Sequence, residues 1–90
     1  MEDILSILQT NEEKQIAIAN KIKQVRKSKR VSQELLSKMS NVSFGSIKRF
    51  ESTGEISLFS LLKICSALNI NLKIDNPHPI QGKKIDFYNE

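Results

Sequence analysis

The chain is poor in the residues on which many small proteins depend. Its 90 residues include one cysteine, no tryptophan, three glycines and two prolines. A single cysteine excludes a disulfide or a multi-cysteine metal site within one chain, and it fits a reducing compartment, so a cytoplasmic location is expected. The scarcity of glycine and proline favours helices, because both residues destabilise helix interiors.

Several functional signals are also missing. No apolar run reaches the roughly 18 residues of a membrane span, and Glu2 and Asp3 stand where an export signal would be basic. The segment 82–84 lacks the glycine spacing of a phosphate loop, and His78 lies between two prolines without a ligand set. No recognisable catalytic set of Ser, His and Asp is present. We therefore expect no catalytic residue, no metal, no cofactor and no enzyme.

Charge is present, and it is unevenly distributed. The net charge is +4, yet residues 1–20 carry four acids and one base, whereas residues 21–30 carry six bases and no acid. The bases are Lys21, Lys23, Arg26, Lys27, Lys29 and Arg30. Such a cluster attracts a polyanion such as a nucleic acid, although a solvated helix face is the alternative interpretation.

The first long element is predicted by its capping pattern. Thr10 and Glu13 form the ends of a capping box, and a helix should follow to about Ser28. A short apolar segment at residues 4–8 precedes it and is either a brief helix or a frayed end. The apolar positions of the long helix recur every three or four residues and predict its core face: Ile18, Ala19, Ile22 and Val25.

Two shorter helices joined by a tight turn should follow. Ser32 is a suitable N-cap for a helix to about Met39, and Ser43 for a helix to about Glu51. The turn at residues 40–42 includes Asn41, one of the few non-glycine residues that tolerate positive φ.

The wheel of the third helix separates two faces. Ile47 and Phe50, with Ser46 beside them, are predicted to face the core. Phe44, Gly45, Lys48 and Arg49 fall on the opposite arc. Glycine within a helix costs about 1 kcal/mol relative to alanine, and close backbone approach to a partner or simple local packing could justify it.

A fourth helix should begin after Ser57, with one apolar face formed by Leu58, Leu61, Leu62, Cys65 and Leu68. Cys65 on that face is a core residue rather than a nucleophile. Ile70, Leu72 and Ile74 then alternate with polar residues, which predicts a strand. A lone strand needs a partner, and the simplest one is the same strand of a second copy; an extended segment that pairs with nothing is the alternative.

Together these features resemble the Cro/repressor (Xre-type) helix-turn-helix family. The resemblance spans about residues 18–70 and rests on residues 31–36, on the turn 41–43, and on Ile47, Arg49 and Glu51. It implies an all-α, lambda-repressor-like fold of four or five helices. The segment 49–58 and the strand 72–74 are similar to the antitoxins of Hip-type toxin–antitoxin pairs.

The resemblance also implies roles for individual residues. Phe44, Gly45, Lys48 and Arg49 would contact DNA bases, and Gln33 and Ser43 would contact phosphates. Arg26 and Glu51 match a structural ion pair. We also assign phosphate contacts to Ser46, Lys27, Lys29 and Arg30. Contacts with the phosphate backbone of DNA give affinity rather than sequence information.

The sequence departs from the family pattern at four places. Ser40 stands where leucine is usual and Asn41 where glycine is usual, which predicts a thinner core at the turn. Phe44 and Gly45 replace polar base readers, although Phe44 could touch a thymine methyl group. Base reading would therefore rest on Lys48 and Arg49, with a phosphate or surface contact as the alternative for Arg49.

These inferences predict an N-terminal extension (1–11), a DNA-binding domain with its strand (12–75) and a flexible tail (76–90). The tail's apolar residues either dock on a partner or belong to a plain end: Ile80, Ile85, Phe87 and Tyr88. The expected function is a homodimeric repressor of a pseudo-palindromic operator in double-stranded DNA, acting as an antitoxin with a kinase-type toxin. A stand-alone phage-type repressor and a protein-interaction module without base reading are the alternatives.

Overall fold

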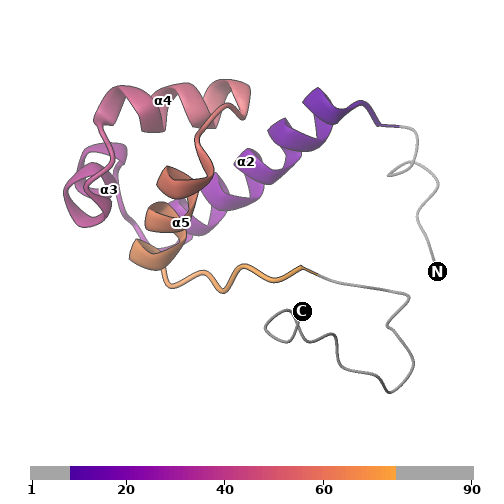
Figure 1. Cartoon of the computed structure of the whole chain (residues 1–90). Helices are drawn as coiled ribbons and strands as arrows, with labels where there is room; N and C mark the ends of the chain where they lie inside the picture. The colour runs from indigo at the N-terminus through magenta and orange to yellow at the C-terminus, as the bar shows by residue number, and fades with distance from the viewer. Residues whose placement is uncertain (1–8, 75–90) are drawn as a thin grey trace, which may run out of the picture.

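A computed structural model of the chain describes residues 9–74. Within this range the chain forms four helices and no strand (Figure 1). They are α2 (Asn11–Ser28), α3 (Gln33–Ser40), α4 (Phe44–Thr53) and α5 (Leu58–Ala67). The predicted all-α class and the order of the helices are confirmed, whereas the segment 4–8, the tail 76–90 and His78 lie outside the described residues.

The helices begin where the sequence predicts them to begin. In the capping box before α2, the Thr10 N–H donates to Glu13 Oε1 at 2.9 Å, and the Glu13 N–H donates to Thr10 Oγ1 at 3.1 Å. Serine hydroxyls accept a backbone N–H at the start of the other helices. Each such cap contributes about 1 kcal/mol, because it satisfies a donor that the helix leaves unpaired.

A left-handed residue follows each of the four helices, and the one after α4 is Gly54. Asn41 has φ 61°, as the turn required, but Arg30 (φ 59°) and Asn69 (φ 61°) were not predicted. After α2, the Val31 N–H reaches back to Arg26 O at 3.1 Å; after α5, the Ile70 N–H reaches Cys65 O at 2.8 Å. This pattern is the Schellman motif, which turns the chain sharply and packs the next apolar residue on the helix end.

One core gathers residues from all four helices. The buried apolar side chains are Ala19, Ile22, Leu36, Val42, Ile47, Phe50, Ile64, Cys65 and Leu68. The prediction for Ile18 was wrong, since 49% of its surface is exposed. The inward face of α2 is centred on Ala19, Ile22 and Arg26, and the N-terminal turns of α2 extend past α4 and α5 (Figure 1).

The predicted core face of α5 was also partly wrong. Ile64, which the sequence reading omitted, is fully buried, whereas Leu58 and Leu62 are 67% and 44% exposed. Apolar residues of α5 occupy most sides of the helix, so their periodicity alone does not determine which side faces the core. Cys65 is buried as predicted, and burial raises the pKa of its thiol.

The segment after α5 forms no strand within the single chain, although it is the segment predicted to pair across a dimer. Ile70 packs against the core, whereas Leu72 is 47% and Ile74 is 99% exposed. The hydrogen bond of Ile70 to the end of α5 therefore anchors this segment, and its apolar side chains beyond Ile70 face outward.

Candidate nucleic-acid interface

The outer face of α4 is assembled as the helical wheel predicts. Ile47 and Phe50 are buried at 0% and 2% exposure, and the residues of the opposite arc are exposed. Those residues are Phe44, Gly45, Lys48 and Arg49. Ser46 is exposed too, which corrects its predicted place beside the core. Exposure at Ser46 leaves its hydroxyl accessible to a partner that approaches this helix.

The turn between α3 and α4 is held by hydroxyl groups. Ser40 is 6% exposed; its Oγ donates to Leu36 O at 2.7 Å and accepts the Val42 N–H at 3.2 Å. Ser37 Oγ donates to Val42 O at 2.6 Å. Ser40 thus replaces the expected leucine with hydrogen bonds, which connect the end of α3 to Val42 in the turn.

A buried ion pair connects the end of α2 to α4. Arg26 Nε donates to Glu51 Oε2 at 2.7 Å and Arg26 Nη2 donates to Glu51 Oε1 at 2.9 Å. The two side chains are 8% and 3% exposed. Arg26 Nη1 also donates to Val31 O at 2.7 Å, so the guanidinium holds α4 and the α2–α3 connection together.

Gln33 extends this pair. Its Nε2 donates to Glu51 Oε1 at 2.9 Å, which places the first residue of α3 against α4. Burial raises the pKa of Glu51, but the hydrogen bonds from Arg26 and Gln33, together with the charges of Arg26 and Lys23, outweigh burial and leave the pKa of Glu51 below its usual 4.5. The phosphate contact assigned to Gln33 stays a prediction.

Basic side chains lie around a shallow hollow beside the pair. The hollow is lined by Lys23, Gln33, Lys48, Arg49, Glu51 and Ser52. It therefore brings together residues of α2, α3 and α4. Lys23 and Lys48 bring positive charge to this surface, which favours an anion there. The sequence placed Lys23 in the basic cluster at residues 21–30 but did not predict it as a residue of this site.

Gly45 stands at the start of the exposed face. A Cβ built on Gly45 meets no atom within 4 Å, so local packing does not explain the glycine and that alternative is wrong. Its neighbour Phe44 is 40% exposed, and Lys48 Nζ lies 5.4 Å from the centroid of the Phe44 ring. This cation–π contact places the Lys48 ammonium group over the ring.

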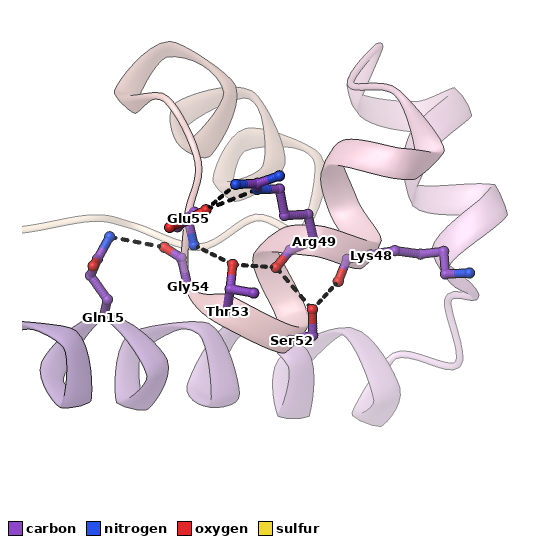
Figure 2. Close-up of polar contacts among 7 residues, drawn as sticks. All are labelled: Gln15, Lys48, Arg49, Ser52, Thr53, Gly54 and Glu55. Carbon is purple, nitrogen blue, oxygen red and sulfur yellow. Dashed lines mark hydrogen bonds and ion pairs between the residues drawn. The ribbon is translucent and has the colours of Figure 1, made fainter.

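Arg49 has a partner that sequence reasoning missed. Its Nε donates to Glu55 Oε1 at 2.9 Å, and its Nη2 donates to the same oxygen. Figure 2 shows Arg49 reaching from α4 toward the loop that carries Glu55, while Lys48 points away from it. The spacing of six residues across a helix end gives no periodic signal, so only the path of the loop reveals this pair.

The remaining predicted phosphate contacts lie on two parts of the surface. Ser43 caps α4, and its Oγ donates to Ser46 Oγ at 2.8 Å. Lys27, Lys29 and Arg30 are exposed at the end of α2 and in the connection that follows it. Their contacts with DNA stay predictions.

Two negative observations concern only the described residues. Among residues 9–74, no group of three or more His, Cys, Asp or Glu side chains is arranged to hold a metal ion. None of the helices in that range is both long enough and apolar enough to cross a membrane.

The comparisons with known proteins agree with this geometry. A family model described as Helix-turn-helix matches residues 22–74, more than half of the chain. The match begins within α2 and includes α3, the turn, α4, α5 and the extended segment. A comparison with the curated proteins returns no match.

Proposed function

The chain belongs to the Xre-like helix-turn-helix family, and from that premise we propose that it is a sequence-specific repressor of transcription. The family match supports a DNA-binding transcription regulator. The repressor role, the individual contacts and the partners are our proposal. One observation carries it: α4 buries Ile47 and Phe50 while its opposite arc is open to solvent.

In the proposed complex, α4 enters the major groove of double-stranded DNA. Gly45 brings the helix backbone close to the groove wall, because no side chain separates them. Phe44 contacts a thymine methyl group, and Lys48 and Arg49 donate to base edges. A bidentate contact of Arg49 with guanine contributes about 1–3 kcal/mol of discrimination.

Phosphate contacts surround this face in the proposal. Gln33, Ser43 and Ser46 position the ends of α3 and α4 on the backbone, and a basic cluster adds affinity. The contacts come from three members of the basic cluster at residues 21–30, which precede α3: Lys27, Lys29 and Arg30. The charge of the cluster supports this arrangement, since it releases counterions from DNA on binding.

We further propose that two copies bind together. The exposed Leu72 and Ile74 follow the anchored Ile70, and strands of two copies pair there. The α4 helices of the two copies, which are the recognition helices, then lie about 34 Å apart on a pseudo-palindromic operator. This distance is one helical turn of DNA.

The narrower proposal is an antitoxin that represses its own operon and binds a kinase-type toxin. The resemblance of residues 49–58 to Hip-type antitoxins supports it. A kinase-like reading frame beside the gene would favour the antitoxin, whereas its absence would favour a stand-alone repressor. We also propose that the chain is not an enzyme.

A second candidate function is a protein-interaction module, and a specific surface favours it. A hollow between α3 and α5 is lined by Met39, Phe59, Leu62 and Ala67, together with the polar residues Ser40, Lys63 and Ser66. Phe59 is 70% exposed and Met39 is 47% exposed. An apolar surface of this kind suits a protein partner better than it suits DNA.

Competition binding separates the two functions. The full chain is titrated with duplex DNA from upstream of its own gene, with random duplex as competitor, over a series of salt concentrations. A regulator keeps its preference for the upstream duplex. In the double variant Lys27→Ala and Lys29→Ala, the slope of log binding constant against log salt concentration should become shallower by about 0.9 per lost phosphate contact. Lys14→Ala, outside the cluster, is the control. Equal competition by random duplex would contradict the proposal.

A further inference from the structure

We infer that Glu55 is a positioning residue for Arg49 and thereby determines which base the protein prefers at one operator position. The inference rests on the proposed function, because it assigns a base contact to Arg49. It adds a residue outside α4 to the reading surface, on the loop between α4 and α5.

The geometry of the pair leaves part of the guanidinium available. Arg49 uses Nε and Nη2 on Glu55 Oε1, so the carboxylate occupies one edge of the planar group. Among residues 9–74 no group accepts a hydrogen bond from Arg49 Nη1. Arginine carries five donors in a fixed fork, and the Nη1–Nη2 edge is the one left for guanine O6 and N7.

The loop holds Glu55 in place through a series of contacts (Figure 2). The Glu55 N–H donates to Thr53 Oγ1 at 3.1 Å, and Thr53 Oγ1 donates to Arg49 O at 2.8 Å. Gly54 O accepts from Gln15 Nε2 at 3.3 Å. The backbone that carries Glu55 is therefore tied both to the last turn of α4 and to α2.

The backbone of Gly54 restricts the loop further. Its φ is +83°, and a Cβ there would lie 2.8 Å from the Gln15 backbone carbon. The loop thus passes against α2 with no room for a side chain, and its path is fixed by the packing of two helices. Glu55 leaves the loop at a defined place relative to Arg49.

The opposite charges of Arg49 and Glu55 favour a contact of Arg49 with a base over a contact with a phosphate. A free arginine on this face would be drawn to the nearest phosphate, whereas Glu55 offsets the positive charge of Arg49 and would itself be repelled by phosphates. An extended arginine also loses rotamer freedom when it binds a base. Because Glu55 already holds the Arg49 side chain before DNA binds, less rotamer freedom is lost, and the contact of Arg49 with a base is favoured.

The test is a double-mutant cycle on DNA discrimination. The probes are the duplex that wild-type protein selects from a randomised pool and its single-base variants. Glu55→Ala is compared with wild type, and again in the Arg49→Ala background. Glu12→Ala, which removes an exposed acid from the first turn of α2, controls for the change in net charge. Thermal unfolding of each variant monitors the fold.

We expect Glu55→Ala to reduce discrimination about threefold to fivefold at one base position, the range that an exposed ion pair allows. Glu55→Gln, which keeps an acceptor for Nε–H, should restore part of it. In the Arg49→Ala background Glu55→Ala should leave discrimination unchanged. Glu12→Ala should leave discrimination unchanged in both backgrounds.

Three outcomes would overturn the inference. If wild type discriminates but Glu55→Ala only raises affinity equally for every duplex, Glu55 acts by repulsion and not through Arg49. An equal loss of discrimination in both backgrounds would also exclude Arg49 as the intermediary. If wild type itself fails to discriminate among duplexes, the proposed function fails and the inference falls with it.

Discussion

At the scale of single residues, the polar groups inside the domain matter most. Glu51 is the clearest case, since its carboxylate accepts from Arg26 and Gln33 and is almost fully enclosed. Burying a charge is costly unless its partners stay in place. The resemblance of the sequence to a known family implied the Arg26–Glu51 pair, but it did not predict that Gln33 would join it.

Removing Glu51 should destabilise the domain before it affects base reading. Glu51→Ala leaves Arg26 buried without its partner, at a cost of about 3–5 kcal/mol. Urea denaturation measures the free energy of unfolding. Glu55→Ala is the matched control because its pair with Arg49 is exposed and should contribute less than about 1 kcal/mol. Similar unfolding curves for the two variants would contradict a structural role for Glu51.

The same pair predicts a pH dependence. Because the pKa of Glu51 is lower in the folded chain than its usual 4.5, its ionised form stabilises the fold above that pH. The contribution should disappear as pH falls from 4.5 through the lower native pKa. Glu51→Gln cannot titrate, so the difference in unfolding free energy between wild type and this variant should shrink on acidification. A constant difference from about pH 7 to about pH 3 would contradict the assignment.

Gly45 gives a prediction in which stability and binding change in opposite directions. A Cβ at this position meets no atom of the chain, so Gly45→Ala should raise the unfolding free energy by up to about 1 kcal/mol. The same methyl group should lower affinity for operator DNA if the backbone approaches the groove wall. Thermal unfolding and DNA titration measure the two effects, and unchanged affinity would exclude the close approach.

At the scale of elements, the ends of the helices decide the arrangement more than their interiors do. The α4–α5 loop shows this, because Gly54 has a left-handed φ and touches the backbone of α2. The sequence predicted a loop at this position, but it did not predict its path. Both the pairing of Arg49 with Glu55 and the placement of α5 depend on that path.

Gly54→Ala should therefore destabilise the domain by about 2 kcal/mol or more, because it combines an unfavourable φ with a steric clash. Gly45→Ala is the matched control, since it makes the same chemical change in open space. Thermal unfolding of the two variants should move in opposite directions. A stable Gly54→Ala variant would mean that the loop can move away from α2.

At the scale of the whole molecule, apolar surface remains exposed on one chain. Leu58 and Phe59 on α5 are 67% and 70% exposed, and Ile74 is almost fully exposed. A small domain with such a surface gains stability when a partner covers it. The proposed dimer would cover Leu72 and Ile74 and would also set the spacing of its two copies of α4.

The dimer is tested by placing a charge on the extended segment. Leu72→Asp with Ile74→Asp should convert a dimer to a monomer and weaken operator binding, because two linked half-sites bind far more tightly than one. Analytical ultracentrifugation measures the mass. Lys73→Asp, on the intervening residue, is the control for added negative charge. An unchanged mass for the double variant would exclude pairing through this segment.

The sequence by itself determined the helices, their starting residues and the outer face of α4. Those features depend on local causes: a serine or threonine hydroxyl caps a helix, asparagine accepts a left-handed φ, and apolar residues recur with the helical period. The Arg26–Glu51 pair could be predicted only through the family resemblance, because no local rule connects residues so far apart in the chain.

Only the tertiary structure decided which sides of α2 and α5 are buried, and it placed Ile18 and Leu58 outside the core. It also brought Gln33 to Glu51 and Glu55 to Arg49. These outcomes depend on how the helices pack and on the path of a loop that passes against α2, and no local pattern records either. The predicted base-reading face was thus visible in the sequence, whereas the side chains that hold it in position became visible only in the folded chain.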